Sequence, residues 1–298
     1  MPNIKDYSVY ISNTYNGIPG VTVIDSGKPG KNVGLLAITH GNETVGLQIF
    51  DYLIRDFHLQ NKLLNGKVFL IAMNIEAYEK YISQSNNLAY RFIDFDMNRI
   101  FGKKKLKNTL EYKRFELLKP IFDLLDCALD LHSTSLDDQL IGITDEKHLN
   151  MAKCFFDIQD VLVDDLAKMG ACIGYLLDQG KTAFGLECGN HNSPKAYLNG
   201  FRSVINLLIA NGSIYGTIHK HYKLDKILKI KYEIIPKSKE FKFTIQIQGF
   251  TKLSINQIYA TDNSVNYTNN FSNNIYIGLV SKTPLPGVSA GFLLEKIN

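Results

Sequence analysis

Four side chains of metal-binding or acid–base type stand out by their positions in the sequence. His40, His132 and Glu187 each follow a separate apolar run, and Glu43 comes three residues after His40 in the motif HGNE. Imidazole nitrogen and carboxylate oxygen suit Zn²⁺, and two histidines with one glutamate leave its fourth position open for water. The pattern indicates a zinc site made by His40, Glu43 and His132, with Glu187 as an acid–base side chain at the same edge of the sheet.

Each of these residues also has an ordinary explanation when it is taken alone. Glu43 could cap the helix that follows it, and His132 could be a buried histidine bonded to the backbone. Asp130 projects to the same strand face as His132 because the two are two residues apart. It could orient a ligand or the substrate site, or it could cap a neighbouring turn.

The elements that position these residues alternate between strands and helices over the first two-thirds of the chain. Apolar runs predict strands at 33–38, 67–73, 127–131 and 182–186, and helical spacing predicts helices at 45–59, 112–125, 149–157, 160–168 and 196–210. Such runs are typical of strands covered on both faces, so we predict an α/β fold with a mainly parallel or mixed sheet flanked by helices. Ligands bind such sheets at the carboxyl ends of the strands, which is where the polar residues should converge.

The hydrophobic pattern of the sequence changes near residue 210. Residues 229–235 and 241–248 alternate with period two, and residues 263–274 are rich in Asn, Ser and Thr and suggest a long loop. We therefore predict a catalytic domain at 1–210 and a smaller, β-rich C-terminal domain at 211–298.

A second dense segment of polar residues is RFIDFDMNR, at positions 91–99. Arginine is suited to bidentate recognition of a carboxylate, so Arg91 and Arg99 could bind a substrate. The alternative is a surface cluster of salt bridges in which these arginines pair with Asp94 and Asp96.

Taken together, the motifs HGNE, RFIDFDMNR, DLHSTS and LECG resemble, in their order and intervals, the succinylglutamate desuccinylase/aspartoacylase family. The resemblance covers roughly residues 30 to 200. It implies the zinc carboxypeptidase-like fold, followed by a β-rich C-terminal domain. In this family His40 and Glu43 would match the paired zinc ligands, His132 the third ligand, and Glu187 the catalytic glutamate that activates water and passes its proton to the leaving amine.

The same resemblance implies roles for the arginine-rich segment. Arg91 matches the arginine that polarises the scissile carbonyl and stabilises the oxyanion, and Asn98 with Arg99 matches the pair that grips the substrate's α-carboxylate. The loop after Glu187 departs from the aspartoacylases, because it holds no secure equivalent of the arginine that reads an acidic substrate side chain. His191 in this loop could line the substrate pocket or bond only to local backbone.

These observations predict a zinc-dependent amidohydrolase that binds one Zn²⁺ per chain and cleaves a small N-acyl amino acid or a similar carboxylate-bearing amide. A carboxypeptidase-like peptide hydrolase is the close alternative. An open groove would favour the peptidase, whereas a C-terminal domain that walls off the site would favour the deacylase. Cys188, beside the base, is expected to be a packing residue rather than a nucleophile.

The uneven distribution of charge along the chain is compatible with a second class of function, a non-enzymatic binding module. The net charge is +4, and from residue 211 onward 11 Lys stand against 5 Asp and Glu, so this part carries +6 and the first 210 residues about −2. A non-enzymatic module could use this basic half to bind nucleic acid. A solvated, lysine-rich β-surface is the simpler interpretation. We expect a small-molecule substrate as the partner, with neither nucleic acid nor membrane, and the chain could form a homo-oligomer.

The N-terminal segment, the apolar runs and the cysteine spacing predict a cytoplasmic protein. Residues 1–6 lack the basic and apolar regions of a signal peptide, and no apolar run approaches the ~20 residues that span a bilayer. The four cysteines, at 127, 154, 172 and 188, show no CxxC spacing. Buried free thiols in a reducing compartment are the simplest expectation.

Overall fold

The main feature of the fold is one large mixed sheet. The computed structural model describes residues 7–84, 88–135, 139–155, 158–218 and 224–297, and within them an 11-stranded sheet has the order β12-β15-β16-β10-β8-β7-β9-β6-β4-β5-β3. Its strands are β3 (Val21–Asp25), β4 (Asn32–Ala37), β5 (Lys67–Ala72), β6 (Cys127–Thr134), β7 (Ile141–Thr144), β8 (Asp160–Val163), β9 (Thr182–Asn190), β10 (Lys226–Ile234), β12 (Thr251–Leu253), β15 (Ile275–Gly278) and β16 (Gly291–Lys296). Two small sheets consist of β1 (Thr14–Tyr15) with β2 (Ile18–Pro19), and of β11 (Lys242–Phe243), β13 (Ile258–Asp262) and β14 (Val265–Thr268).

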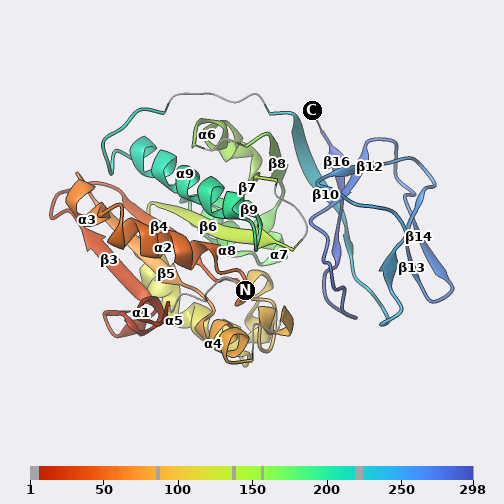
Figure 1. Cartoon of the computed structure of the whole chain (residues 1–298), viewed down its shortest axis with the longest axis horizontal. Helices are drawn as coiled ribbons and strands as arrows, with labels where there is room; N and C mark the ends of the chain where they lie inside the picture. Colours follow the sequence, from red (N-terminus) through yellow and green to blue (C-terminus); the bar gives the residue numbers. More distant parts are fainter. Residues whose placement is uncertain (1–6, 85–87, 136–138, 156–157, 219–223, 298) are drawn as a thin grey trace.

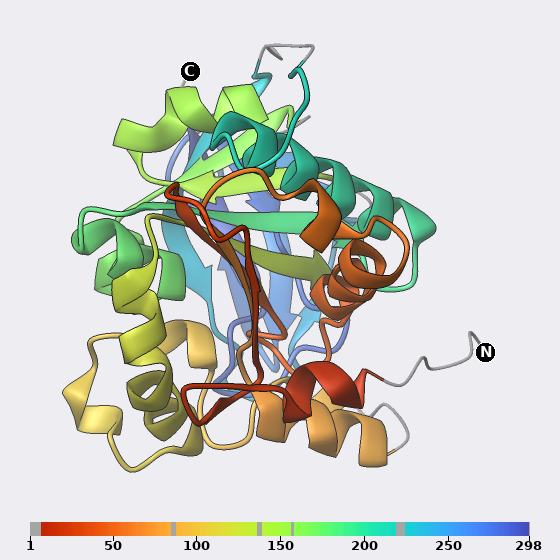
Figure 2. The ribbon, with the colours of Figure 1, turned by 90° about the vertical axis from the view of Figure 1, so that its left-hand side faces the viewer.

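Helices cover both faces of the sheet in the first two-thirds of the chain (Figures 1 and 2). The α-helices are α1 (Ser8–Ser12), α2 (Val45–Arg55), α3 (Leu59–Lys62), α4 (Ile75–Ser83), α5 (Leu110–Leu124), α6 (Leu149–Phe155), α7 (Leu166–Met169), α8 (Cys172–Asp178) and α9 (Pro194–Ala210). The 3₁₀ turns are η1 (Leu88–Arg91), η2 (Met97–Arg99), η3 (Lys104–Leu106) and η4 (Glu146–His148).

The central strands are apolar on both faces because two separate cores meet there. Leu35 of β4 belongs to the core that α2 and α9 cover, whereas its neighbour Leu36 belongs to the core that α5 and α8 cover. Both side chains are fully buried. Period-two alternation between two apolar layers produces the unbroken apolar run that the sequence shows. The predicted α/β class with a mixed, helix-flanked sheet is confirmed.

Several predicted elements were wrong in type or extent. The segment 160–168 was expected to be helical, but it forms β8 and then the short α7, because its buried first residues fill a place in the sheet between β7 and β10. A short apolar run does not distinguish a strand from a buried helix. The predicted helix 45–59 ends at Arg55, and β6 and β9 continue past His132 and Glu187 to Thr134 and Asn190.

The C-terminal elements also differ from expectation. The expected long loop at 263–274 contains β14, which pairs with β13 across a turn where Asn263 has a positive φ of 55°. The alternating run 241–248 keeps only two residues in a strand, β11. Alternation predicts which residues could face a core but does not show whether a partner strand is present along the whole run.

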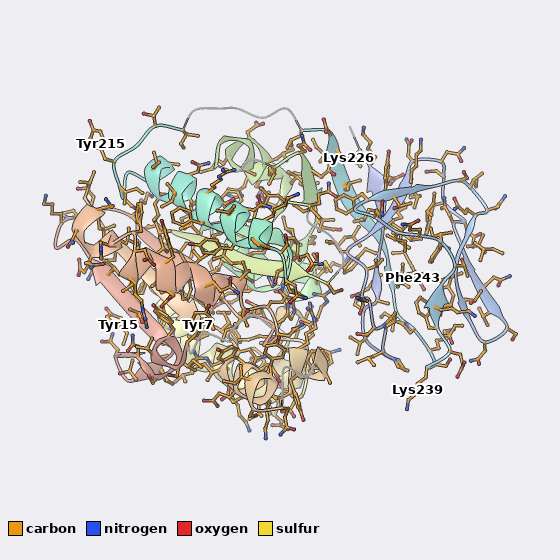
Figure 3. The ribbon with its side chains drawn as sticks, in the orientation of Figure 1. Tyr7, Tyr15, Tyr215, Lys226, Lys239 and Phe243 are labelled. Carbon is orange, nitrogen blue, oxygen red and sulfur yellow. The ribbon has the colours of Figure 1, made fainter. Side chains whose placement is uncertain are left out.

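The large sheet continues across residue 210. Strand β10 pairs parallel with β8 and antiparallel with β16, so the C-terminal strands extend the same sheet. Lys226, labelled in Figure 3, lies at this junction. Its Nζ atom is 3.0 Å from Oδ2 of the buried Asp160. In Figure 1, β13 and β14 lie on the right, away from the helices. The division into domains at residue 210 stays a prediction.

Two further expectations concern helices and cysteines. No helix in the described part of the chain combines the length and apolarity needed to cross a bilayer. Cys127, Cys172 and Cys188 are buried free thiols, as expected. The side chain of Cys154 lies outside the described residues.

Candidate active site

The loop after β4 turns His40 into a cavity at the edge of the sheet. Ile38 has a φ of +52°, a conformation that is strained for a β-branched residue, and its carbonyl accepts a hydrogen bond from the backbone of Asn74 at 3.0 Å. Gly41 lies so close to α4 that an added Cβ would be 2.5 Å from the carbonyl carbon of Ala77. A strained residue and a glycine therefore direct the HGNE motif inward.

Three potential ligands converge in this cavity. One ligand atom each of His40, Glu43 and His132 lies within 4.8 Å of the others, and all three residues are buried. The Nδ1 atom of His40 is 2.9 Å from Oε1 of Glu43, and the Nδ1 atom of His132 is 2.9 Å from Oε2. Yet Nδ1 of His40 makes no hydrogen bond within the described part of the chain. Both imidazole Nδ1 atoms and the carboxylate thus face one another, as ligands of a shared cation would.

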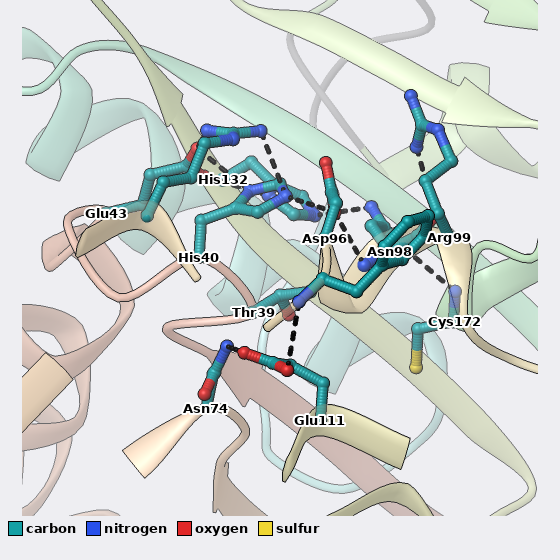
Figure 4. A network of polar contacts seen from close by, with 12 residues as sticks. Thr39, His40, Glu43, Asn74, Asp96, Asn98, Arg99, Glu111, His132 and Cys172 are labelled. Carbon is teal, nitrogen blue, oxygen red and sulfur yellow. Dashed lines mark hydrogen bonds and ion pairs between the residues drawn. The ribbon is translucent and has the colours of Figure 1, made fainter. Parts of the chain in front are cut away.

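The far nitrogens of both histidines lie against carboxylates, and Figure 4 shows His40 beside Asp96. The Nε2 atom of His132 lies 2.9 Å from Oδ2 of Asp130, and that of His40 lies 3.1 Å from Oδ1 of Asp96. Thr39 donates to the other oxygen of Asp130 at 2.7 Å. A carboxylate on Nε2 orients the ring so that the lone pair of a deprotonated Nδ1 would point at a shared metal, the usual arrangement behind metal-binding histidines. The residues present therefore fit a zinc ion.

Electrostatics keeps Glu43 ionised. Burial alone would raise the pKa of Glu43, but the positive charges of His40 and Arg91 and the hydrogen bond from His132 hold it well below its usual range. Arg91 forms an ion pair with Oε1 of Glu43. The backbone carbonyl of Arg91 also accepts a hydrogen bond from the backbone N–H of Gly41 at 2.9 Å. The segment that carries Arg91 is thus joined directly to the HGNE loop.

Glu187 reaches the same cavity from the neighbouring strand. Parallel β6 and β9 pair in a register that sets His132 opposite Glu187. The Oε2 atom of Glu187 is buried and makes no hydrogen bond with any described residue. Burial raises the pKa of Glu187 to about 7, and the negative charge of Glu43 adds to this against the opposing charges of His132 and Arg91. Such a carboxylate is suited to accepting and releasing a proton near neutral pH.

Asn98 and Arg99 lie on η2 at the rim of the histidine pair. The Nδ2 atom of Asn98 is 3.4 Å from Nε2 of His132, and its Oδ1 accepts a hydrogen bond from the backbone of Cys172 at 2.9 Å. The guanidinium of Arg99 donates to Oε1 of Glu233 at 3.1 Å, which joins this turn to β10. A substrate carboxylate would share Arg99 with Glu233.

The alternative of an internal salt-bridge cluster in segment 91–99 does not match these contacts. Arg91 pairs with Glu43 and Arg99 pairs with Glu233, both outside the segment. Asp94 accepts a hydrogen bond from the backbone of Leu110 at 2.8 Å. The polar residues of the segment are therefore distributed among other parts of the site.

All eight residues proposed from the sequence line one cavity of about 230 Å³: His40, Glu43, Arg91, Asn98, Arg99, His132, Glu187 and His191. The ring of His191 lies 2.7 Å, at Nδ1, from the hydroxyl oxygen of Ser133, and burial lowers its pKa. Part of the cavity lining comes from the C-terminal segment, which contributes Val280, Leu285 and Phe292 among others.

Sequence reasoning missed several residues that hold this arrangement together. Glu111 is buried and accepts hydrogen bonds from the backbone of Ile93 at 2.7 Å and of Phe95 at 3.2 Å. Ser133 donates its backbone N–H to Glu43 at 3.2 Å. Both contacts join segments far apart in the chain, so no local pattern predicts them. Asp96 lay within the segment already singled out, but its contact with His40 had no sequence signal.

Comparison with known proteins agrees with this site. The family model described as the succinylglutamate desuccinylase/aspartoacylase catalytic domain matches residues 29–194. The chain belongs to the succinylglutamate desuccinylase/aspartoacylase family. It is therefore a hydrolase of the desuccinylase/aspartoacylase type. No curated protein matches the chain in a sequence search.

Solved structures show the same fold at low sequence identity. The succinylglutamate desuccinylase of Vibrio parahaemolyticus is 17% identical, with a TM-score of 0.72 over 94% of this chain and 87% of that one. The corresponding protein of Chromobacterium violaceum is 19% identical, with a TM-score of 0.68 over 94% and 89%. A product-bound ectoine utilization protein EutE (DoeB) of Ruegeria pomeroyi is 16% identical, with a TM-score of 0.68 over 94% and 89%.

Proposed function

We propose that this family member is a zinc-dependent amidohydrolase that cleaves the amide bond of a small N-acyl amino acid or a similar carboxylate-bearing amide. His40, Glu43 and His132 would hold one Zn²⁺ per chain. The observation that carries the proposal is the convergence of these three ligand atoms within 4.8 Å, with Nε2 of both histidines against a carboxylate. A bound zinc ion would act as a Lewis acid and lower the pKa of water from 15.7 to about 7.

The chain's own residues supply the remaining chemistry. Glu187 would accept the proton of the attacking water with its unpartnered Oε2 and deliver it to the leaving nitrogen. Arg91 would donate to the carbonyl oxygen as negative charge develops there, a contribution typically of about 3–4 kcal/mol. Asn98 and Arg99 would bind the α-carboxylate and so orient the scissile bond. His191, held by Ser133, would contact the substrate from the loop after β9.

The shape of the cavity favours a small substrate over a peptide. Residues of the C-terminal segment 279–292 line the cavity, and the backbone of Lys282 donates to Oγ of Ser135 at 3.3 Å, beside the His132 strand. A peptide chain would need an open groove on this side. The product-bound EutE structure supports small-molecule binding by this fold in that protein.

The basic C-terminal half does not favour a nucleic-acid module. Three of its lysines pair with acids: Lys226 with Asp160, Lys229 with Glu146 and Lys231 with Glu295. Each pair reduces the positive charge available to a phosphate backbone. A filter-binding assay at low salt should retain no nucleic acid, and salt-sensitive retention would support the module.

The proposal is tested by metal analysis and a hydrolysis screen together. Purified protein should bind close to one equivalent of zinc and release free amine from members of an N-acyl amino acid panel. His132→Ala should lose zinc and activity. Glu187→Gln should keep its zinc and lose activity by roughly 100-fold to 10,000-fold. Full zinc content and full activity in His132→Ala would refute the ligand assignment.

A further inference from the structure

The active-site cavity has a second half that the proposed chemistry does not use. Beyond the histidines and arginines its wall is apolar over β7, α7, α8, β10 and β16. Six side chains carry the argument: Ile143, Leu166, Met169, Ile173, Ile230 and Phe292. This apolar wall faces the same space as the candidate zinc ligands, so a substrate bound at the metal would contact both.

The apolar wall is continuous rather than scattered. Ile143 packs against the core that contains Leu166 and Ile173, and also against the C-terminal cluster to which Ile230 and Phe292 belong. Ile143 on β7 thus contacts both the cluster that includes residues of α7 and α8 and the cluster against which Ile230 and Phe292 pack. It connects the apolar residues on the two sides of this half of the cavity.

This surface begins beside the proposed base. Gly185 lies two residues before Glu187 in β9 and therefore on the same face of the strand. A Cβ added at Gly185 would lie 3.2 Å from Cδ1 of Ile173 and 3.3 Å from Cβ of Ile143. Glycine keeps this corner of the cavity free of a side chain, so a substrate group next to the scissile bond can meet the two isoleucines.

Positive charge is confined to the other half. Among the described residues that line the cavity, the lysines and arginines are Arg91 and Arg99 alone. Arg91 contacts Glu43, and Arg99 sits with Glu233 where the α-carboxylate would bind. A second carboxylate placed on the apolar wall would be desolvated with no cation to pair with, which is strongly unfavourable.

We infer that the substrate carries an uncharged, apolar group on one side of the scissile amide, and that dicarboxylic substrates are poor. This inference rests on the proposed amidohydrolase function and specifies its substrate class. The apolar group could be the side chain of the amino acid or the acyl chain. The apolar wall would recognise either the side chain or the acyl chain, and matched substrate pairs distinguish these two possibilities.

The first experiment measures kcat/KM of the zinc-loaded protein on two matched pairs. N-acetyl-L-leucine against N-acetyl-L-aspartate tests the side chain, and N-isovaleryl-L-alanine against N-succinyl-L-alanine tests the acyl group. The apolar member should exceed the acidic one by at least about tenfold in one pair, which identifies the group that meets the wall. Preference for the acidic member in either pair, or equal rates within both, would overturn the inference and leave the proposed function standing. Absence of hydrolysis of all four would overturn the proposed function and the inference together.

A second experiment changes the wall itself. Met169 is half-buried at the end of α7, and Met169→Arg would bring a cation into the apolar half. The ratio of apolar to acidic kcat/KM should fall by at least about tenfold. Met151→Arg, the same change at an exposed position of α6 outside the cavity, is the matched control and should leave the ratio unchanged. An unchanged ratio in a folded, zinc-binding Met169→Arg protein would overturn the inference. If Met169→Arg does not fold, the wild-type pairs decide.

Discussion

Asp130 should control how tightly the site holds zinc. It is 1% exposed, and its Oδ2 atom lies 2.9 Å from Nε2 of His132 while Oδ1 accepts a hydrogen bond from Thr39 at 2.7 Å. The carboxylate is fixed from both sides, so it holds the imidazole with Nδ1 toward Glu43. Burial favours the neutral ring, but the charges and hydrogen bonds of Asp130 and Glu43 outweigh it and raise the pKa of His132 well above its usual range.

The substitution Asp130→Asn removes this charge while keeping the shape. The amide oxygen can still accept from Nε2 of His132, but a neutral hydrogen bond is about half as strong as a charge-assisted one. The ring becomes a weaker base and less firmly oriented. Loss of such a partner typically weakens metal binding by about 10-fold to 100-fold. That range corresponds to about 1.4–2.8 kcal/mol of binding free energy.

The assay is a zinc competition titration against a chromogenic chelator at fixed pH, with circular dichroism to confirm the fold. Asp51→Asn is the matched control, because Asp51 is also buried but pairs with Arg55 and accepts from Tyr10, away from the ligands. It should leave the zinc Kd unchanged. A folded Asp130→Asn protein whose zinc Kd stays within about threefold of wild type would refute the reasoning, because it lies outside the range expected for such a partner.

Three further predictions address the base, the carboxylate site and the scaffold. The pKa of Glu187 is raised to about 7, and bound zinc would lower it by adding positive charge, so kcat/KM should fall as pH drops through a value below about 7. A pH–rate profile with the same acid limb in Glu187→Gln would contradict this. Glu233→Gln should free Arg99 and lower KM by about twofold to fivefold with kcat unchanged, and a raised KM in steady-state kinetics would count against it. Glu111→Ala should lower the free energy of unfolding by about 3 kcal/mol in urea titrations, since it removes a buried carboxylate that accepts hydrogen bonds from the backbone of Ile93 and Phe95. A change below about 1 kcal/mol would show that water replaces the carboxylate.

The sequence predicted the strands that carry the site because their signals are local. Apolar runs end at polar residues in β4, β6 and β9, and the rule that ligands bind at the carboxyl ends of strands then brings His40, His132 and Glu187 together. Segment 160–168 failed because its buried residues fit a strand or a helix equally well until its neighbours are known.

The apolar half of the cavity could not have been predicted in this way. Ile230 and Phe292 reach the site only because β10 joins β8 in parallel and β16 then pairs with β10. That pairing connects residues more than fifty positions apart, and period-two alternation in β10 does not indicate which face meets the catalytic half. The substrate preference therefore depends on long-range sheet order, whereas the zinc ligands depend on short motifs.

The register between β6 and β9 decides whether Glu187 faces the cavity, and the residue after it packs on the opposite face of the sheet. His132 opposes Glu187 in this register, and a slip of one residue would turn Glu187 to the opposite face of the sheet. On that face Cys188 is buried under α9, where a Cβ added at Gly200 would lie 2.9 Å from its Sγ atom. Burial raises the pKa of the Cys188 thiol well above its usual range, which disfavours the thiolate and agrees with a packing role. Its close packing against the helix instead keeps the neighbouring carboxylate on the cavity side.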